Sequence, residues 1–263
     1  MIKIENTEIV GWEAAVREMY NAMGSCEESD SERKYESWHD ISGGYFEIGP
    51  NDLDLIMHLR DSVADYRKFM RTITVYVDII APLYWWKEFG AYTVETAANS
   101  CSIMSKIADK EFTLEDFSCE HLMSFYNSNY WEEDSDNACF IDPGKTEVVV
   151  PRSLMLNYII PMLNAARDKY NEMDQKLKKS DLVETEKLRA MAQRKRFLWQ
   201  VIQLLPSSYN QKRMVMLNYE ILMNLYESYQ NNKFDEWSTF CDWIEGLPYS
   251  ELIIRKESIY AKN

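Results

Sequence analysis

The chain has 263 residues, and its 29 lysines and arginines against 43 aspartates and glutamates give a formal net charge of −14. Hydrophobic residues make up 46% of it, which allows a substantial core and excludes global disorder. With only eight glycines and seven prolines, the composition disfavours a turn-rich all-β sandwich and favours long helices. The acidic balance excludes nonspecific electrostatic binding to nucleic acid, because phosphate contacts require clustered Lys and Arg. A local pocket for a small anion stays open.

The five cysteines are an odd number without a CxxC pair. This pattern predicts buried free thiols rather than a disulfide framework or a zinc site, and no metal site is expected. The N-terminus lacks a basic region followed by an apolar core, and no stretch reaches the ~18 apolar residues of a membrane span. We therefore expect a cytoplasmic protein with neither a membrane nor a nucleic-acid partner.

The first predicted helix covers residues 12–23, where apolar residues recur along one stripe. A polar, acidic loop is expected at 25–32. Asn51 or Asp52 is expected to cap a second helix that runs to about Arg60.

The best strand candidate is residues 72–79, which are rich in β-branched and aromatic side chains with partial alternation. Pro82 suits the first turn of a short aromatic helix over 83–89, and Gly90 is its expected end. Residues 92–96 are predicted to be extended, as a strand or a loop.

In the middle of the chain a helix is expected at 116–126, followed by an acidic loop at 127–137. The carboxylates of that loop lack the spacing of metal ligands and indicate a solvated surface. Residues 151–163 lead into long charged helices between 165 and 196.

Two further helices are predicted at 213–229 and 235–245, and Gly246 is expected to end the second. The sequence contains no repeat or linker, so one domain is predicted. Glycine-rich nucleotide loops, metalloprotease motifs and serine-hydrolase motifs are absent. The three histidines lie far apart and are predicted to be surface or packed imidazoles.

Two stretches of the sequence share the spacing of a known pair of motifs. The first runs from 73 to 100, and the second is Leu204-Leu205-Pro206 followed by Asn218-Tyr219-Glu220-Ile221-Leu222-Met223-Asn224. Together they resemble ThyX, the flavin-dependent thymidylate synthases, in which Leu-Pro precedes an Asn-x-Arg-x-x-x-Asn segment that opens a helix. Pro206 and Asn218 lie 12 residues apart, and Asn218 and Asn224 lie six apart. The resemblance covers about 10–108 and 196–250.

The resemblance implies an α+β fold, with a mostly helical chain around a small antiparallel sheet. It implies a single ThyX-like domain over residues 1–263, in which about 109–195 form either a helical lobe of the family or an insertion. It also implies a homo-oligomer, which is a tetramer in that family, with active sites built from several subunits.

At the motif positions the sequence departs from the family, so the motif is degenerate. The ThyX triplet Arg-His-Arg falls on Lys87, Glu88 and Phe89, and Glu220 replaces the arginine of the second segment. These changes remove positive charge and twice add negative charge. A nucleotide phosphate and a flavin diphosphate would therefore need other cations, for which the candidates are Lys87, Arg71, Arg213 and the basic run at 194–196.

The resemblance makes Glu95 the expected catalytic residue, which would hold a water or hydrogen-bond the pyrimidine. The residues expected to bind substrate or cofactor are Lys87, Tyr92, Asn99, Ser100, Arg213, Asn218 and Asn224. Simpler interpretations stay open: Glu95 as an exposed strand residue, Asn99 and Ser100 as a helix cap, and the two helical asparagines as surface polar groups.

The implied activity is reductive methylation, or a related one-carbon modification, of a uridine nucleotide such as dUMP. FAD would be the cofactor, with NADPH and methylenetetrahydrofolate as co-substrates, and protein groups would mainly orient base and flavin. The degenerate motif leaves a second hypothesis beside this one. The protein would then be a catalytically silent relative that binds a nucleotide or a partner protein without turnover.

Overall fold

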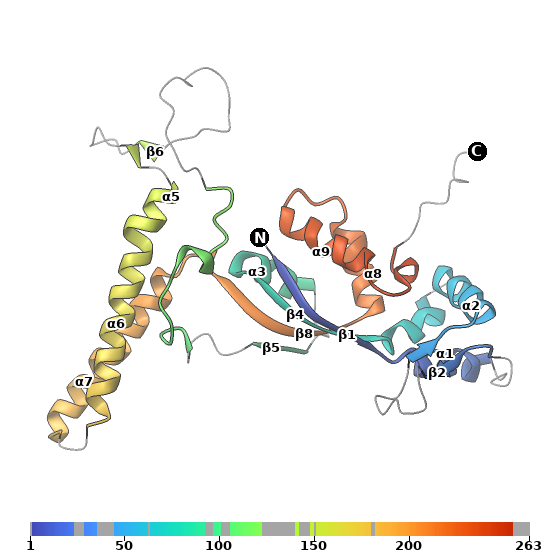
Figure 1. Cartoon of the computed structure of the whole chain (residues 1–263), viewed down its shortest axis with the longest axis horizontal. Helices are drawn as coiled ribbons and strands as arrows, with labels where there is room; N and C mark the ends of the chain where they lie inside the picture. Colours follow the sequence, from blue (N-terminus) through green and yellow to red (C-terminus); the bar gives the residue numbers. More distant parts are fainter. Residues whose placement is uncertain are drawn as a thin grey trace. The chain divides into compact units, whose positions relative to one another are not determined.

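The computed structural model describes residues 2–23, 29–35, 45–62, 64–92, 97–100, 106–122, 140–141, 148–149, 151–179 and 182–254 (Figure 1). The chain divides into two compact units, which are described separately below. Unit 1 contains Ala81–Trp86 and Ser100–Gln211, and unit 2 contains Ile2–Ile80, Lys87–Asn99 and Lys212–Asn263. The prediction of one domain with a helical lobe or insertion at about 109–195 stays a prediction.

A four-stranded sheet has the strand order β1-β4-β8-β5. Its strands are β1 (Lys3–Val10), β4 (Thr74–Pro82), β8 (Asn210–Asn218) and β5 (Ala97–Ser100). β1 and β4 are antiparallel, with Lys3 opposite Ile80 and Val10 opposite Thr74. The side chains of β4 alternate between buried and half-buried, because successive residues of a strand point to opposite faces and only one face is fully covered. The predicted strand at 72–79 is confirmed from Thr74 onward. It continues to Pro82, which was expected in the first turn of the next helix and is instead the last residue of β4.

The predicted helix at 213–229 is wrong in its first part, because β8 occupies that stretch and α8 (Tyr219–Tyr229) begins only after it. Lysine, arginine, methionine and leucine all favour helices, and this stretch is rich in them. In the structure the residues alternate, and Val215 and Leu217 are buried on one face of the sheet. Pairing within the sheet therefore overrides the local helix preference.

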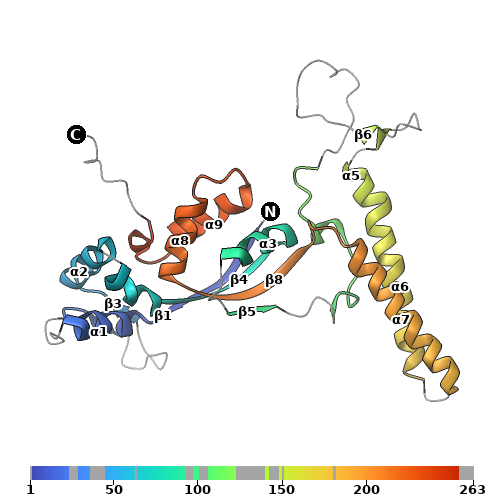
Figure 2. The ribbon, with the colours of Figure 1, turned by 180° about the vertical axis from the view of Figure 1, so that it is seen from behind.

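Unit 2 also contains α1 (Trp12–Met23), β2 (Glu32–Lys34), β3 (Tyr45–Glu47), α2 (Pro50–Asp61), η2 (Ala64–Arg71), α9 (Asp235–Glu245) and η6 (Ser250–Leu252). β2 and β3 pair as an antiparallel hairpin. α8 and α9 lie on the same side of the strands (Figure 2). The predicted helices at 12–23 and 235–245 are confirmed with the same bounds, and Gly246 is the C-cap of α9.

Two predictions about helix ends in this part of the chain are wrong. The N-cap of α2 is Gly49, not Asn51 or Asp52. Asp52 is instead buried, and it accepts hydrogen bonds from the hydroxyls of Tyr20 (2.5 Å) and Ser29 (2.6 Å). Burial raises the pKa of Asp52, but the hydrogen bonds outweigh this effect and hold the pKa below its usual range. The carboxylate of Asp52 therefore connects α2 to Tyr20 and Ser29 and does not cap the helix.

The second correction concerns the aromatic helix. α3 runs over Leu83–Tyr92 and therefore continues through Gly90. Gly90 is exposed, and a side chain there would meet no atom within 4 Å. A single glycine costs a helix only about 1 kcal/mol, which the buried aromatic residues around it outweigh.

Trp237 of α9 lies at the centre of an aromatic cluster in unit 2 and is completely buried. The ring of Tyr229 stacks on it at a centroid distance of 3.5 Å, and Phe89 and Phe240 lie 6.5 Å and 5.8 Å away. The indole Nε1 donates to Oε2 of Glu88 at 2.9 Å. This cluster joins α3, α8 and α9, and Glu88 provides the acceptor for the buried indole N–H of Trp237.

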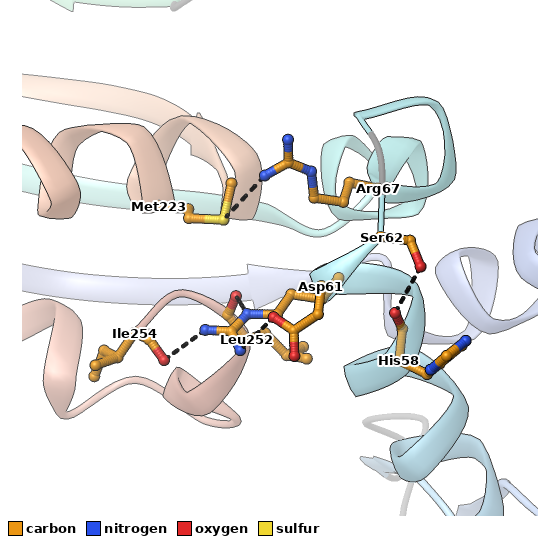
Figure 3. Close-up of polar contacts among 8 residues, drawn as sticks. His58, Asp61, Ser62, Arg67, Met223, Leu252 and Ile254 are labelled. Atoms are coloured by element: carbon orange, nitrogen blue, oxygen red, sulfur yellow. Dashed lines mark hydrogen bonds and ion pairs between the residues drawn. The ribbon is translucent and has the colours of Figure 1, made fainter. Parts of the chain in front are cut away.

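Arg60 of α2 is also buried, and it holds the η6 turn against α2. Its Nε donates to the carbonyl of Leu252 (3.2 Å) and its Nη2 to that of Ile254 (2.7 Å), the two carbonyls drawn in Figure 3. Its Nη1 lies 3.0 Å from a carboxylate oxygen of Asp61. All three nitrogens have partners, so Arg60 is a structural residue and not a free cation.

Unit 1 contains a helical hairpin of α6 (Ile160–Leu177) and α7 (Glu184–Leu204), preceded by α5 (Pro151–Leu154) and a π turn, η5 (Met155–Ile159). Pro161 has no N–H, which accounts for the break in the regular helix just before it. The long charged helices predicted between 165 and 196 are confirmed.

The core of unit 1 is made by buried apolar residues from both helices and from the preceding loop: Ile107, Phe112, Phe117, Cys119, Met155, Ile160, Leu163 and Val201. The helix predicted at 116–126 is wrong where the structure describes it. Only η3 (Leu114–Asp116) is helical, and Phe117 instead forms a β-bridge with Tyr209. The loop predicted at 127–137 lies outside the described residues. The described part of unit 1 also has a short antiparallel pair, β6 (Phe140–Ile141) and β7 (Val148–Val149).

The helices and the antiparallel strand pairs confirm the predicted α+β class. Cys119 and Cys241 are free and buried, as predicted, and the other cysteines lie outside the described residues. Burial raises the pKa of both thiols, that of Cys241 to about 11, so neither is a thiolate at neutral pH. Within the described residues, no helix combines the length and the apolar character that crossing a membrane requires.

Candidate functional site

Basic side chains of η2 face the first turns of α8. Arg71 binds the carboxylate of Glu220 through Nε and, at 3.4 Å, through Nη2. The N–H of Tyr219 donates to the carbonyl of Ile73 at 3.1 Å and ties the start of α8 to the residues that follow η2. We name this surface the η2–α8 face, and its residues are Arg67, Arg71, Asn218, Glu220 and Asn224.

Arg67 extends from η2 toward α8, where its Nη1 lies 4.0 Å from the sulfur of Met223 (Figure 3). A thioether is only a weak acceptor. Within the part of the chain that the structure describes, the buried Nε of Arg67 has no hydrogen-bond partner. A buried donor without an acceptor costs about 1–3 kcal/mol, so this nitrogen is a candidate contact for an acceptor outside the described residues.

Sequence reasoning selected Arg71 in this region but missed Arg67. The signal was the basic cluster in the segment before β4, where Arg67, Lys68 and Arg71 lie within five positions. Its importance depends on α8, which follows Arg67 by about 150 residues in the chain. Sequence spacing alone does not reveal such a contact.

Asn218 is the N-cap of α8, and its side-chain oxygen accepts a hydrogen bond from the N–H of Ile221 at 2.9 Å. This contact satisfies one of the donors at the helix start that have no partner within the helix. The amide nitrogen of Asn218 is not used by the cap. Asn224 is exposed one turn beyond Glu220 on α8, so both asparagines keep an amide group that can bind a ligand.

Glu220, which the sequence resemblance aligns with an arginine, forms an ion pair with Arg71 in the structure. The side chain of Glu220 is 16% exposed and that of Arg71 is 54% exposed. The pair therefore lies at the surface, where a strongly bound anion can compete for the guanidinium.

Of the residues predicted from the first motif, α3 carries Lys87 and Tyr92. Lys87 is exposed, while the neighbouring Glu88 turns toward Trp237. Tyr92 is the last residue of α3, and its side chain lies outside the described part of the structure. Glu95, the expected catalytic residue, lies outside the described residues. For Asn99 and Ser100 the structure describes only the backbone, which belongs to β5.

Arg213 is half-buried on β8, and burial lowers the pKa of its guanidinium below the ordinary value. It precedes Asn218 by five residues of extended strand, which separates their Cα atoms by about 16 Å. The described structure records no contact among Lys87, Arg213, Asn218 and Asn224, so it does not bring these predicted residues into one cluster.

The basic run at 194–196 lies on α7 in unit 1. Arg194 donates to Asp174 of α6 at 2.5 Å and lies over the ring of Tyr170 at 5.7 Å. Its guanidinium stabilises the hairpin, which favours a structural role on the helix surface over a phosphate site. Among the described residues no group of three or more His, Cys, Asp or Glu side chains is placed to hold a metal ion.

No protein-family model matches the chain, and a search of curated proteins gives no significant match. Solved structures do resemble it. The flavin-dependent thymidylate synthase ThyX from Helicobacter pylori, complexed with FAD and dUMP, has 12% identity and a TM-score of 0.55 over 95% of this chain and 97% of that chain. A second structure of Helicobacter pylori ThyX with FAD and dUMP has 13% identity and a TM-score of 0.52, over 96% and 95%.

A third solved structure is that of a UMP/dUMP methylase from Streptomyces cacaoi, PolB. It has 12% identity over 93% of this chain and 88% of that chain, and the TM-score is only 0.48. The two ThyX likenesses extend over nearly the whole of both chains. At such low identity they concern the fold and not the chemistry. The chain therefore has the fold of the flavin-dependent thymidylate synthases, as the two motif stretches predict.

Proposed function

We propose that the protein is a ThyX-like flavoprotein that carries out reductive methylation, or a related one-carbon modification, of a uridine nucleotide such as dUMP. The observation that carries the proposal is the fold likeness over 95% of this chain to a synthase described with FAD and dUMP bound. NADPH and methylenetetrahydrofolate would be the co-substrates.

The η2–α8 face fits the anionic part of a flavin. The buried Nε of Arg67 lacks an acceptor among the described residues, and a phosphate oxygen would provide one. Arg71 would contribute a second charge when an anion displaces Glu220, and Asn218 and Asn224 would donate from their amides. When bound, reduced flavin supplies the hydride, and the protein groups bind and orient.

The nucleotide would be held by the residues that the first motif contributes. Glu95 is proposed to hydrogen-bond the pyrimidine or hold a water beside it, and Lys87 with Arg213 to neutralise the phosphate. Tyr92, Asn99 and Ser100 are proposed to contact the base or the phosphate.

A catalytically silent relative remains the second candidate, and two carboxylates favour it. Glu88 is committed to the indole of Trp237, and Glu220 is committed to Arg71. Both stand within the motifs that are cationic in ThyX. A relative without those cations would bind a nucleotide or a partner protein without turnover.

We also propose a homo-oligomer, a tetramer by the family resemblance. Large apolar side chains are exposed along the helices of unit 1, as expected for surfaces that associate: Leu156, Tyr158, Met162, Leu188, Met191 and Trp199. Light scattering coupled to gel filtration should give the mass of four chains. A monomer at micromolar concentration would contradict this part of the proposal.

The visible absorption spectrum of the purified protein, before and after addition of FAD and dUMP, tests the flavoprotein proposal. We expect a bound-flavin spectrum, and Arg67→Ala should weaken FAD binding by about tenfold, because a charge-assisted hydrogen bond contributes roughly 1.5–3 kcal/mol. Arg189→Ala on the exposed face of α7 removes the same charge elsewhere and serves as the control. A protein that stays colourless with both ligands contradicts the flavoprotein and supports the silent relative.

A further inference from the structure

Unit 2 contains a pocket of about 1,210 Å³ that none of the predicted site residues line. Its walls come from the end of β1, the first turn of α1, the β2–β3 hairpin and the segment after α9. Small-molecule sites commonly measure about 300–1,000 Å³, so the pocket has room for a ligand of nucleotide size. It shares no residue with the η2–α8 face.

Aromatic side chains form much of the pocket wall. Trp12 packs edge-on against Tyr249, with ring centroids 5.0 Å apart, and the indole of Trp243 donates to the hydroxyl of Thr7 at 3.1 Å. These contacts hold the rings of Trp12 and Trp243 in place. Tyr45, from the β2–β3 hairpin, is 53% exposed. Aromatic faces that line a pocket and stay in contact with solvent favour a planar ligand that stacks on them.

The pocket also carries two guanidinium groups, Arg17 and Arg33, and one carboxylate, Glu13. Nη2 of Arg33 lies 2.6 Å from Oε2 of Glu13, with both side chains about half exposed. Arg17 is exposed, and no carboxylate of the described residues forms an ion pair with it. The pKa of Glu13 is held below its ordinary range, mainly by the hydrogen bond from Arg33 and also by the charge of Arg17. The charge of Arg17 therefore reaches the same part of the pocket as the Arg33–Glu13 pair.

The net positive charge of this pocket contrasts with the net charge of −14 of the whole chain. An acidic surface repels anions, so a locally cationic pocket with aromatic walls selects for anions that also have a ring. Gly11 forms part of the rim with a φ of +102°, and a Cβ there would lie 2.1 Å from the carbonyl oxygen of Thr72. Only glycine fits at this position, so the strand-to-helix junction at the rim has a fixed geometry.

We propose that this pocket is a second ligand site, which binds a planar heteroaromatic ring with an anionic group, the ring lying against Trp12 and Tyr45 and the anion on Arg17 and Arg33. The anion is a phosphate or a carboxylate, since a guanidinium binds both in the same bidentate way. The site is independent of the proposed flavin site.

The test uses the full-length chain and titration calorimetry, with tryptophan fluorescence as a second readout. AMP represents the phosphate form, folic acid the carboxylate form, and adenosine the ring without the anion. We expect AMP or folic acid to bind with a Kd below about 100 μM and adenosine to bind at least tenfold more weakly, because it lacks the charge-assisted contacts. Which of the two anions binds more tightly identifies the anionic group.

Three variants place the binding in this pocket. Arg17→Ala should weaken binding about tenfold. Ala14→Leu should block binding, because the larger side chain on α1 would occupy part of the pocket. Arg189→Ala is the charge-matched control and should leave the affinity unchanged. Glu13→Gln should tighten binding about threefold, because it removes the carboxylate that competes with the ligand for Arg33. If the Glu13–Arg33 ion pair were purely structural, the substitution would give no gain in affinity.

The far-ultraviolet circular dichroism and the Tm of each variant are measured to confirm folding. Arg67→Ala separates the two sites, since it should weaken FAD and leave AMP and folic acid unaffected. The proposal is overturned if neither anion binds below 1 mM, or if Arg17→Ala and Ala14→Leu fold and bind as the parent does. Loss of AMP or folic acid binding in Arg67→Ala instead of Arg17→Ala would also overturn it.

Discussion

Glu88 on α3 and Glu220 on α8 are two carboxylates at positions where the sequence resemblance leads us to expect cations, yet they have different partners. Glu88 accepts a hydrogen bond from the buried indole of Trp237 and belongs to the aromatic cluster. Glu220 pairs with Arg71 on the η2–α8 face, which also contains Arg67, whose buried Nε has no acceptor among the described residues. One carboxylate belongs to a packed cluster, and the other neutralises a cation on the surface that we propose binds the flavin.

This difference shows that two carboxylates at positions where the resemblance leads us to expect cations need not have the same structural role. The carboxylate in α3 accepts from a neutral donor inside a packed cluster. Among the described residues, the carboxylate in α8 pairs with a cation near the surface, and ion pairs of this kind contribute about 0–1 kcal/mol. Substitutions on the two sides should therefore affect different quantities, stability on the α3 side and ligand affinity on the α8 side.

The largest effect is expected from Trp237→Ala, which removes the centre of the aromatic cluster. Replacing a buried large aromatic residue by alanine costs about 3–5 kcal/mol through lost burial and the cavity left behind. The urea midpoint of unfolding should fall accordingly. A variant with the midpoint of the parent protein would show that the cluster around Glu88 is not structural, and the comparison would fail.

Like Glu88, Glu245 accepts a hydrogen bond from an aromatic side chain, and here the donor is the hydroxyl of Tyr226 at 2.6 Å. This hydrogen bond, with burial, raises the pKa of Tyr226 to about 12 from the ordinary 10. The folded state thus keeps the proton that the unfolded chain loses above pH 10, so stability is full below pH 10 and declines as the pH rises toward 12. The loss should be about 2 kcal/mol.

Denaturation curves between pH 9 and 12 measure this decline, and Tyr226→Phe should flatten it. Phenylalanine has no proton to lose, so the variant is less stable at neutral pH but varies less with alkaline pH. An identical alkaline slope in both proteins would contradict the assignment to Tyr226.

Glu88→Ala should reduce the free energy of unfolding by about 1–3 kcal/mol, because it leaves the buried indole N–H of Trp237 without its acceptor. Glu88→Gln keeps an acceptor oxygen and should cost less than half as much. The ratio of the two effects, measured by urea denaturation, separates the hydrogen bond from the charge. Equal losses in both variants would assign the effect to charge, and Glu88 would then resemble Glu220.

Local patterns predicted the parts of the fold that depend on local interactions. The helices at 12–23 and 235–245 have an apolar stripe and clear ends, and their bounds agree with the structure. β8 was mispredicted, because its helix-favouring residues are held extended by partners elsewhere in the sheet. Sheet pairing is a non-local interaction, and no window of the sequence contains it.

The candidate site, like the fold, was predictable from the sequence only where it depends on local interactions. The spacing of Asn218 and Asn224 was recognisable because the two residues lie six positions apart in the sequence, and the cap role of Asn218 follows from its place just before α8. The significance of Arg67 depends on Met223, 156 positions later. The pocket of Arg17 and Arg33 is assembled from four separate segments. Such assemblies are determined by tertiary packing and leave no spacing pattern in the sequence.

The smallest effect on stability, and the most informative one for function, is expected from Glu220→Gln. The change removes a surface ion pair with Arg71, so the free energy of unfolding should change by less than about 1 kcal/mol. It also removes the carboxylate that competes with a bound anion for the guanidinium of Arg71, and FAD should bind about three- to tenfold more tightly, since 1.4 kcal/mol corresponds to a factor of ten. Fluorescence titration with FAD measures the affinity, and Glu186→Gln on α7 is the charge-matched control. If Glu220→Gln binds FAD no better than that control, Glu220 does not regulate the η2–α8 face, and the distinction between the two carboxylates does not extend to ligand binding.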